Sequence, residues 1–178
     1  KSPDSTPRTW EEALDYANNS TLCSYSDWRL PNIVELLSLI DHGRSNPALP
    51  YGHPFINVEN SYYPSSTTVA YFAPNSDAIW SVYFYDGSIG ASNKSAGWHV
   101  WIVRGSAEGI VQLPRTGQTL SFYAGDDGNL QKGVLWDNPR FTNHGDGTVT
   151  DNFTALMWTQ NTAINYSSWQ SALDYIKG

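Results

Sequence analysis

The feature that most restricts how this chain can fold is a repeat of its own beginning near its end. Residues 168–175 read Ser-Trp-Gln-Ser-Ala-Leu-Asp-Tyr and residues 9–16 read Thr-Trp-Glu-Glu-Ala-Leu-Asp-Tyr. The two stretches align without a gap at an offset of 159 positions, so residues 160–178 retrace residues 1–19. The sequence therefore predicts one repeat followed by the opening of a second.

Two helices have start signals in the sequence. Residues 9–12 and residues 32–35 both have the spacing of a capping box, which satisfies the first backbone N–H groups of a helix. Apolar residues recur at helical spacing after each start, which predicts helices over residues 10–18 and 33–41 with one core-facing side each. The apolar residues are Trp10, Ala13, Leu14 and Ala17 in the first helix and Ile33, Leu36, Leu37 and Ile40 in the second.

Strand patterns follow the second helix. Alternating residues predict a strand over 78–85, a hairpin turn at Asp86-Gly87 and a last strand over 98–104. Residues 46–68 are rich in proline, asparagine and serine and show no period, so we expect a long ordered loop there.

These patterns divide the chain into three parts. Residues 1–105 form the predicted domain body, and residues 106–139, which are rich in glycine and polar residues, read as a linker. Residues 140–178 contain a second Asp-Gly hairpin signal and the repeated helix, and they read as the opening segment of a second copy.

Several motifs of the predicted body together resemble the Lcl C-terminal domain family. They are Trp-x-x-Ala-Leu-Asp-Tyr at residues 10–16 and the stretches at residues 25–32, 65–68, 80–82, 86–87 and 103–105. The stretch from the Gly-Asp-Gly-Thr motif to residue 152, with Leu-Met-Trp at residues 156–158, is similar to the opening of the same domain. Residues 9–105 thus resemble one copy, and residues 140–178 resemble the start of another.

The resemblance implies an α+β chain of C-type-lectin-like fold, with two helices packed on small antiparallel sheets and long ordered loops. It also implies a bacterial protein that is extracellular or at the cell surface and built from tandem copies. Some members adhere to sulfated glycans, and the resemblance does not imply catalysis.

The sequence departs from the family pattern at its cysteine and at the calcium motifs of lectins. Ile102 stands where many members carry a second cysteine, so Cys23 lacks its usual partner. The lectin motifs Glu-Pro-Asn and Trp-Asn-Asp are absent, which argues against calcium-dependent sugar binding of that type.

The resemblance leads to a hypothesis of complementation. The family fold opens with the Gly-Asp-Gly-Thr hairpin, so residues 9–105 lack an opening, and residues 140–178 are an opening without a body. We predict that the second fragment completes a body, either in the same molecule or head-to-tail in another copy, where strand complementation would build a fibre. The residues predicted to make this contact are Phe141, Val149, Phe153, Leu156 and Trp158.

The duplicated helix limits this hypothesis. One body has room for only one of the helices predicted over residues 10–18 and 169–177. Either the chain is a slice of a longer tandem array, or the spare helix packs between subunits.

Charge and hydropathy exclude two classes of partner. A net charge of -7 leaves no basic footprint for nucleic acid. No apolar run approaches the length of a membrane span and Lys1 opens no secretory signal, so we expect no membrane insertion and a soluble chain, mature or excised from a longer one. The expected partners are other copies of the chain and a cell-surface glycan or protein.

The exposed face of the last strands is the predicted ligand-binding surface. Aromatic and polar side chains there are of the kind that hold sugars or proteins with little loss of entropy. Successive residues of a strand point to opposite faces, so about half of the candidates should be buried. An acidic chain also favours a neutral glycan over a sulfated one. The candidates are Tyr83, Tyr85, Asn93, Lys94, His99 and Trp101.

Catalysis and metal binding have little support in the sequence. Cys23 and the four histidines have no spacing that links a nucleophile, a base or a metal, and we expect Cys23 to be a buried, inert thiol. Asp126 and Asp127 offer hard oxygen ligands for a calcium ion, but turn chemistry also explains them. No other cofactor is predicted.

Three function classes follow from these patterns. The first is an extracellular structural or adhesive repeat module, with a fibre subunit as its sharper form. The alternative is a monomeric lectin-like domain that binds a glycan or a protein, and an enzyme is the third class.

Overall fold

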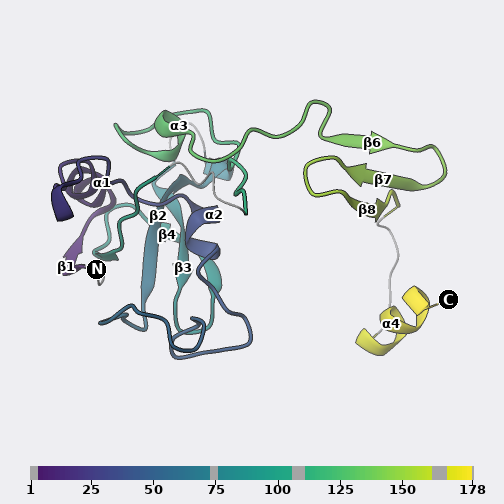
Figure 1. The fold of residues 1–178 in the computed structure, drawn as a ribbon, viewed down its shortest axis with the longest axis horizontal. Coiled ribbons are helices and arrows are strands. Elements are labelled where there is room, and N and C mark those ends of the chain that lie inside the picture. The colour runs from purple at the N-terminus through teal and green to yellow at the C-terminus, as the bar shows by residue number, and fades with distance from the viewer. Residues whose placement is uncertain (1–3, 73–75, 106–110, 162–167, 178) are drawn as a thin grey trace. The chain divides into compact units, whose positions relative to one another are not determined.

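The computed structural model describes residues 4–72, 76–105, 111–161 and 168–177 (Figure 1). In these residues the chain is α+β, with small antiparallel sheets and few helices. It divides into two compact units, Lys1–Leu135 and Trp136–Gly178. We call the first unit the body and the second the opening segment, and each is described by itself.

Helix α1, Trp10–Asn18, begins at the predicted capping box. The Thr9 backbone N–H donates to the Glu12 carboxylate at 2.8 Å, and the Glu12 N–H donates to the Thr9 hydroxyl at 3.4 Å. These bonds pair two backbone groups that the helix itself leaves without partners. The predicted apolar side of α1 is confirmed, because Trp10, Ala13, Leu14 and Ala17 are all buried.

Helix α2, Ile33–Leu37, also begins at its predicted capping box, formed by Asn32 and Glu35. It is shorter than the predicted helix over residues 33–41. The amides of Leu39 and Ile40 donate to carbonyls three residues back, and the Asp41 amide then donates to the carbonyl of Ala48. The chain therefore leaves the helix because a neighbouring loop supplies its next acceptor.

Three strands form the main sheet of the body. They are β2 (Tyr62–Thr68), β3 (Ala78–Tyr83) and β4 (Ser88–Asn93), antiparallel in the order β2-β3-β4. The predicted Asp-Gly hairpin joins β3 to β4, and Gly87 takes a φ of 80° there, which favours glycine.

Strand β2 overturns part of the loop predicted over residues 46–68. Pro64 fits because β2 is an edge strand that pairs only with β3, so one side of the strand needs no amide donor. The hydroxyl-rich residues of β2 are nevertheless buried, and the Ser65 hydroxyl, for example, donates to the Trp80 carbonyl at 2.6 Å. Their polar character conceals a buried strand from sequence patterns.

A second, two-stranded sheet joins the start of the body to its last strand. Strand β1, Asp4–Arg8, pairs antiparallel with β5, Trp98–Val100. The strand predicted over residues 98–104 continues beyond β5 only as the isolated bridge between Arg29 and Val103.

The core of the body consists of two hydrophobic clusters. The first cluster contains the buried side of α1 together with one residue each from β3, from β5 and from the segment that precedes α2. Its members are Trp10, Ala13, Leu14, Ala17, Leu30, Ile79 and Val100. The second cluster involves α2 and the sheet: Leu36, Leu49, Tyr63, Val82, Phe84 and Trp101. Together the clusters fix both helices to the sheets.

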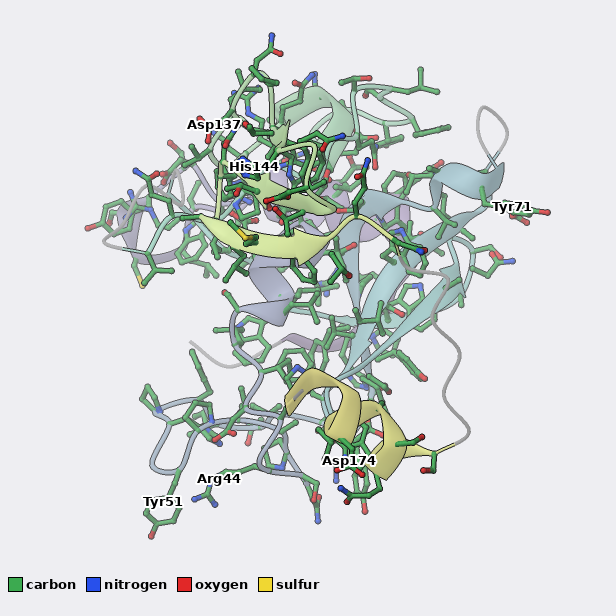
Figure 2. All side chains as sticks on the ribbon, turned by 90° about the vertical axis from the view of Figure 1, so that its right-hand side faces the viewer. Arg44, Tyr51, Tyr71, Asp137, His144 and Asp174 are labelled. Carbon is green, nitrogen blue, oxygen red and sulfur yellow. The ribbon has the colours of Figure 1, made fainter. Side chains whose placement is uncertain are left out.

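The loop between α2 and β2 is anchored by one of its aromatic residues. Phe55 packs edge-on against the Trp101 ring, with 4.8 Å between the ring centroids. Tyr51 points away from the body, and only the guanidinium of Arg44 lies over its ring at 5.3 Å (Figure 2). The loop is thus held to the core by Phe55, whereas Tyr51 lies on its exposed side.

Most of the stretch predicted as a linker belongs to the body. It contains helix α3, Asp127–Leu130, and a bridge between Pro114 and Val134. The Asn18 side-chain amide at the end of α1 donates to the carbonyl of Ala124 at 3.2 Å. The boundary between the two units falls after residue 135, near the end of the stretch predicted as a linker over 106–139.

Glycines in this stretch permit close packing. A Cβ added at Gly128 would lie 2.1 Å from the carbonyl oxygen of Leu120, so a larger residue cannot fit without moving the backbone. A glycine-rich composition is typical of a flexible linker. Composition alone therefore does not predict that this stretch packs as part of the body.

The opening segment contains a three-stranded antiparallel sheet followed by a helix. The strands are β6 (Phe141–Asn143), β7 (Thr148–Asp151) and β8 (Leu156–Thr159), and the helix is α4 (Trp169–Lys177). The predicted hairpin at residues 146–147 joins β6 to β7.

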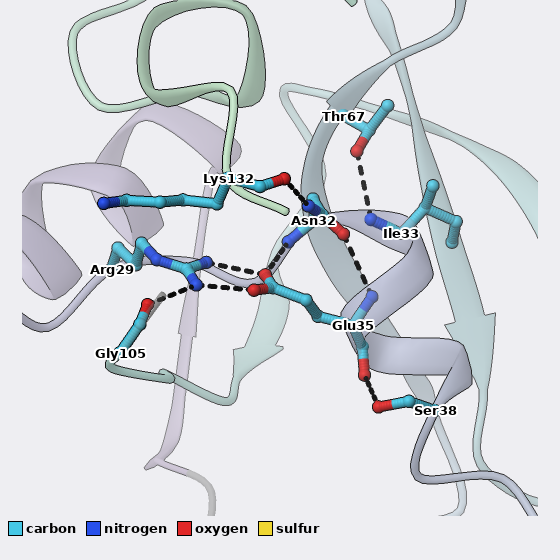
Figure 3. Close-up of polar contacts among 8 residues, drawn as sticks. All are labelled: Arg29, Asn32, Ile33, Glu35, Ser38, Thr67, Gly105 and Lys132. Carbon is cyan, nitrogen blue, oxygen red and sulfur yellow. Dashed lines mark hydrogen bonds and ion pairs between the residues drawn. The ribbon is translucent and has the colours of Figure 1, made fainter. Parts of the chain in front are cut away.

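A buried ion pair links α2 to the chain that precedes it. Arg29 donates from Nη1 to Glu35 Oε2 at 2.6 Å and from Nη2 to Oε1, and both side chains are buried (Figure 3). The same carboxylate accepts the Asn32 N–H of the capping box, and Arg29 also donates to the carbonyl of Gly105. One carboxylate thus starts α2 and neutralises a buried cation.

Replacing Glu35 by alanine should destabilise the body by about 3–5 kcal/mol, because it leaves the buried Arg29 charge without a counter-ion. Chemical denaturation followed by far-UV circular dichroism measures this loss. The control is Asp27→Ala, which breaks the exposed pair between Asp27 and Arg104 and should change stability little. Equal losses in the two variants would contradict the assigned role of Glu35.

Candidate functional site

The sheet of the opening segment has one apolar face. Phe141, Asp151 and Leu156 lie opposite one another across the three strands, and so do Asn143, Val149 and Trp158. Side chains directly opposite in a sheet share a face, so four of these six residues form an apolar surface. The other face carries mainly threonines. We call the set of Phe141, Val149, Leu156 and Trp158 the apolar sheet face.

The apolar sheet face contains four of the five residues predicted for assembly, and it is largely open. Trp158 exposes 58% of its surface, and Phe141 and Leu156 are also exposed. Phe153, the fifth residue, lies outside this face in the turn between β7 and β8, where its amide donates to Asp151. Exposed apolar faces of this kind mark contact surfaces.

Arg140 and Asp151 hold the sheet together beside this face. The guanidinium lies 3.3–3.4 Å from the carboxylate oxygens and over the rings of Trp136 and Phe141. Hydrogen bonding to Arg140 keeps the pKa of the Asp151 carboxyl below its usual value. On the opposite side, His144, which is labelled in Figure 2, pairs with the Thr150 hydroxyl at 2.9 Å.

The two repeated tryptophans lie in opposite environments. Trp10 is 1% exposed, its indole N–H donates to the carbonyl of Ser65 at 2.9 Å, and its ring packs edge-on against Tyr123. Trp169, the aligned residue of α4, is 78% exposed. The tryptophan of the repeated helical motif is thus buried in α1 and exposed in α4.

Two predicted ligand residues lie together in a row of tyrosines. Tyr83 stacks on Tyr62 with 4.7 Å between ring centroids and on Tyr85 with 5.9 Å. The Tyr62 ring in turn lies over Gly90, where an added Cβ would come within 3.1 Å of it. We call Tyr62, Tyr83 and Tyr85 the tyrosine row.

The stacking changes what this row offers a ligand. Rings that face one another present their edges and hydroxyl groups to solvent, whereas a sugar stacks on an open ring face. Tyr62 is not among the predicted ligand residues because it lies in the stretch predicted as a loop, where proline and serine obscure the strand pattern.

Asn93 and Lys94 have structural roles. The Asn93 side-chain oxygen accepts from the backbone and hydroxyl of Ser95 in a turn. The Lys94 ammonium lies 4.2 Å from the Trp10 ring centroid and 4.4 Å from that of Phe122. Burial lowers the pKa of Lys94, and the charge of Asp126 and other acids partly offsets that effect. Lys94 therefore closes the space over Trp10.

His99 and Trp101 do not form an exposed binding surface. Trp101 is only 8% exposed and packs among Phe55, Tyr63 and Phe84 in the second core cluster. The His99 ring lies against Tyr63. The prediction that Trp101 lies on an exposed binding face is wrong, because Trp101 follows the end of β5 and its ring is covered by these three aromatic rings. Of the six candidates, the structure stacks only the half-buried Tyr83 and the exposed Tyr85 together at the surface.

The candidate calcium ligands are used by the body itself. Asp126 accepts from the amides of Phe122 and Asn129 and from the Ser121 hydroxyl, so both its oxygens are engaged. Asp127 accepts hydrogen bonds from two threonine hydroxyls. Among the described residues, no group of three or more acidic, histidine or cysteine side chains is arranged to hold a metal ion. These carboxylates fix the 113–135 stretch.

Cys23 is exposed, which corrects the prediction of a buried thiol. It lies in the short 3-10 turn Leu22–Ser24 with a φ of 54°. The thiol is removed from the core because this left-handed turn directs the chain outward between α1 and α2.

Comparison with known families identifies the body. The Lcl C-terminal domain model matches residues 1–104, and the chain belongs to that family. Neither a curated protein nor a solved structure matches the chain. In the described parts of the chain, no helix has the length and apolar character needed to cross a membrane.

Asp127 gives a pH prediction. Burial raises the pKa of its carboxyl above the usual value, and this effect outweighs the hydrogen bonds from Thr116 and Thr67. A group with a raised pKa in the folded state stabilises the fold below its unfolded pKa, and that contribution is lost as pH rises through the folded value. Asp127→Asn stays neutral, so its stability relative to wild type should increase between about pH 3 and pH 7. Denaturant midpoints across this range measure the difference.

The matched control is Asp126→Asn. Here an amide NH₂ would meet a backbone N–H that the carboxylate now accepts, so the variant should lose about 1–3 kcal/mol. The assignment would be wrong if the two neighbouring substitutions had the same effect at pH 7.

Proposed function

We propose that this chain is a structural and adhesive repeat module of extracellular bacterial proteins, with a C-type-lectin-like body. Its opening segment packs against the body of another copy of the domain, in the same polypeptide or in a neighbouring molecule. In the sharper form of the proposal, donation between molecules joins copies head-to-tail into a fibre. Family membership supports the fold and the extracellular setting, and the repeat supports the assembly.

One observation carries the proposal. The repeated tryptophan is 1% exposed in α1 and 78% exposed in α4. A buried tryptophan contributes several kcal/mol to the stability of a domain, so a second helix with the same apolar residues gains that energy only where a second body receives it.

The apolar sheet face supports the same conclusion. It lies in the same unit as α4 and exposes two large aromatic residues and a leucine. A three-stranded sheet with one apolar face is stable when that face packs on another element. Because β6 and β8 are edge strands, they also offer free backbone groups to another sheet.

The test of this proposal is to extend the chain after Gly178 by a second copy of residues 20–135. Asn19 aligns with Gly178, so the extension continues the repeat in register and supplies α4 with a body. We expect the appended residues to fold as a second body and the amides of residues 156–159 and 169–177 to become protected. Hydrogen exchange read by mass spectrometry compares the extended chain with the unextended one.

The control for the extended chain is Trp169→Ser, which should destabilise the second body and leave the first unchanged. Light scattering adds a readout for the fibre form: the unextended chain should gain mass with concentration, and the extended chain should gain less. An appended segment that remains unprotected both with native α4 and with α4 replaced by the residues of α1, or that does not respond to Trp169→Ser, would refute the proposal.

A lectin-like or protein-binding role is the second candidate, and the tyrosine row is the observation that favours it. Three stacked tyrosines present hydroxyl groups and ring edges on the body surface without a basic residue among them. Such a row fits a neutral, hydroxyl-rich glycan or a polar protein surface better than a sulfated chain.

Tyr85→Ala should weaken retention on immobilised neutral polysaccharides roughly tenfold if the row binds a glycan. Tyr51→Ala, which removes an exposed tyrosine that is not part of the row, is the control and should have no effect. Binding measured by glycan array that is equal in the two variants would exclude the row as the glycan site.

A further inference from the structure

Helix α4 repeats the side of α1 that contacts the body. The two helices share their residues at five positions: Trp169, Ala172, Leu173, Asp174 and Tyr175 in α4 stand where α1 has Trp10, Ala13, Leu14, Asp15 and Tyr16. Three of the shared α1 residues are buried. The shared set is therefore a docking pattern rather than a general preference for helix.

The shared residues of α1 converge on one part of the body. Trp10 donates to the carbonyl of Ser65 and packs against Tyr123, and the Tyr123 hydroxyl donates to the Asp15 carboxylate at 3.1 Å. Lys94 closes the space over the indole. We call Ser65, Lys94, Phe122 and Tyr123 the tryptophan cradle.

In α4 the same side chains have no cradle. Asp174, labelled in Figure 2, accepts a hydrogen bond from Gln170 of its own helix at 2.8 Å, whereas Asp15 accepts from Tyr123. Trp169 is exposed. Trp169 and Asp174 therefore do not make in α4 the contacts that Trp10 and Asp15 make with the body in α1.

The two helices differ at their C-terminal ends, where α1 fits the body most tightly. Ile176 and Lys177 of α4 stand at the positions of Ala17 and Asn18. Ala17 has no exposed surface and lies in the first core cluster. Isoleucine at that position adds three carbon atoms to a filled core, which forces neighbouring groups to move.

Asn18 is exposed, unlike Ala17, but its side-chain amide packs against the backbone of the body. Its side-chain amide donates to the carbonyl of Ala124, and a Cβ added at Gly125 would lie 2.1 Å from the Asn18 amide nitrogen. A lysine is longer than asparagine, so it cannot keep the same contact beside Gly125 and has to extend into solvent. The body described here therefore fits the last turn of α4 less well than that of α1, mainly at the position of Ala17.

We infer that the partner of α4 is the tryptophan cradle of a second, non-identical body, which has more room where Ala17 lies and a different loop opposite Asn18. This inference rests on the proposed function and names its partner. The shared residues dock α4 on a domain of the same family, and the two changed residues direct it away from the body of an identical chain. In the body of an identical chain, α1 already occupies the tryptophan cradle.

The extended chain tests this inference, because its second body is identical to the first and must accept α4. Ile176→Ala combined with Lys177→Asn converts the end of α4 into the end of α1. This double substitution should raise the melting temperature of the second body by roughly 3–10 °C, measured by scanning calorimetry.

The reverse change in the unextended chain is the second measurement. Ala17→Ile with Asn18→Lys should lower the melting temperature of the body by a similar amount, whereas Glu11→Gln, which places another α4 residue on the exposed side of α1, should not. Ala17→Val with Asn18→Lys replaces the first variant if that variant does not fold, and the same direction of change is expected.

The outcomes separate the inference from the proposal on which it rests. A second body that folds and gains stability from the double substitution supports both. A second body that folds equally well with either helix end overturns the inference and leaves the proposed function standing. A second body that folds with neither helix end overturns both.

Discussion

The body depends on the burial of one indole ring. Trp10 connects α1 to the edge strand β2 through the Ser65 carbonyl, to the end of β4 through the Lys94 ammonium, and to the 113–135 stretch through Tyr123. These contacts span more than a hundred positions of sequence. Their combined burial fixes a helix that by itself is too short to be stable in water.

The same dependence explains why the opening segment reads as incomplete. Its helix has the indole and the shared apolar residues of α1, and its sheet has an apolar face, but in its own unit the indole is exposed. An element that is stable mainly through packing retains its apolar residues only where packing uses them. Under the proposed function, the exposed Trp169 and Trp158 are the contact residues of a docking element.

The local parts of the fold could be predicted from sequence and the long-range parts could not. The capping boxes at Thr9 and Asn32 were predictable because each is complete within four residues. Strand β2 was missed because its buried hydroxyls find their partners in distant segments, as Thr67 does with Asp127. Trp101 was placed on the wrong side for the same reason, since the rings that cover it come from three other elements.

Order in an array of similar domains requires that each opening segment recognise one body. Identical helices on one polypeptide would compete for the same cradle, and their high effective concentration would allow exchange. Specificity is a difference between two affinities, and a steric conflict in the wrong complex contributes to it as much as a good contact in the right one. Retaining Trp169 and Asp174 while changing Ile176 and Lys177 meets both requirements, because the first pair keeps the affinity and the second pair sets the neighbour.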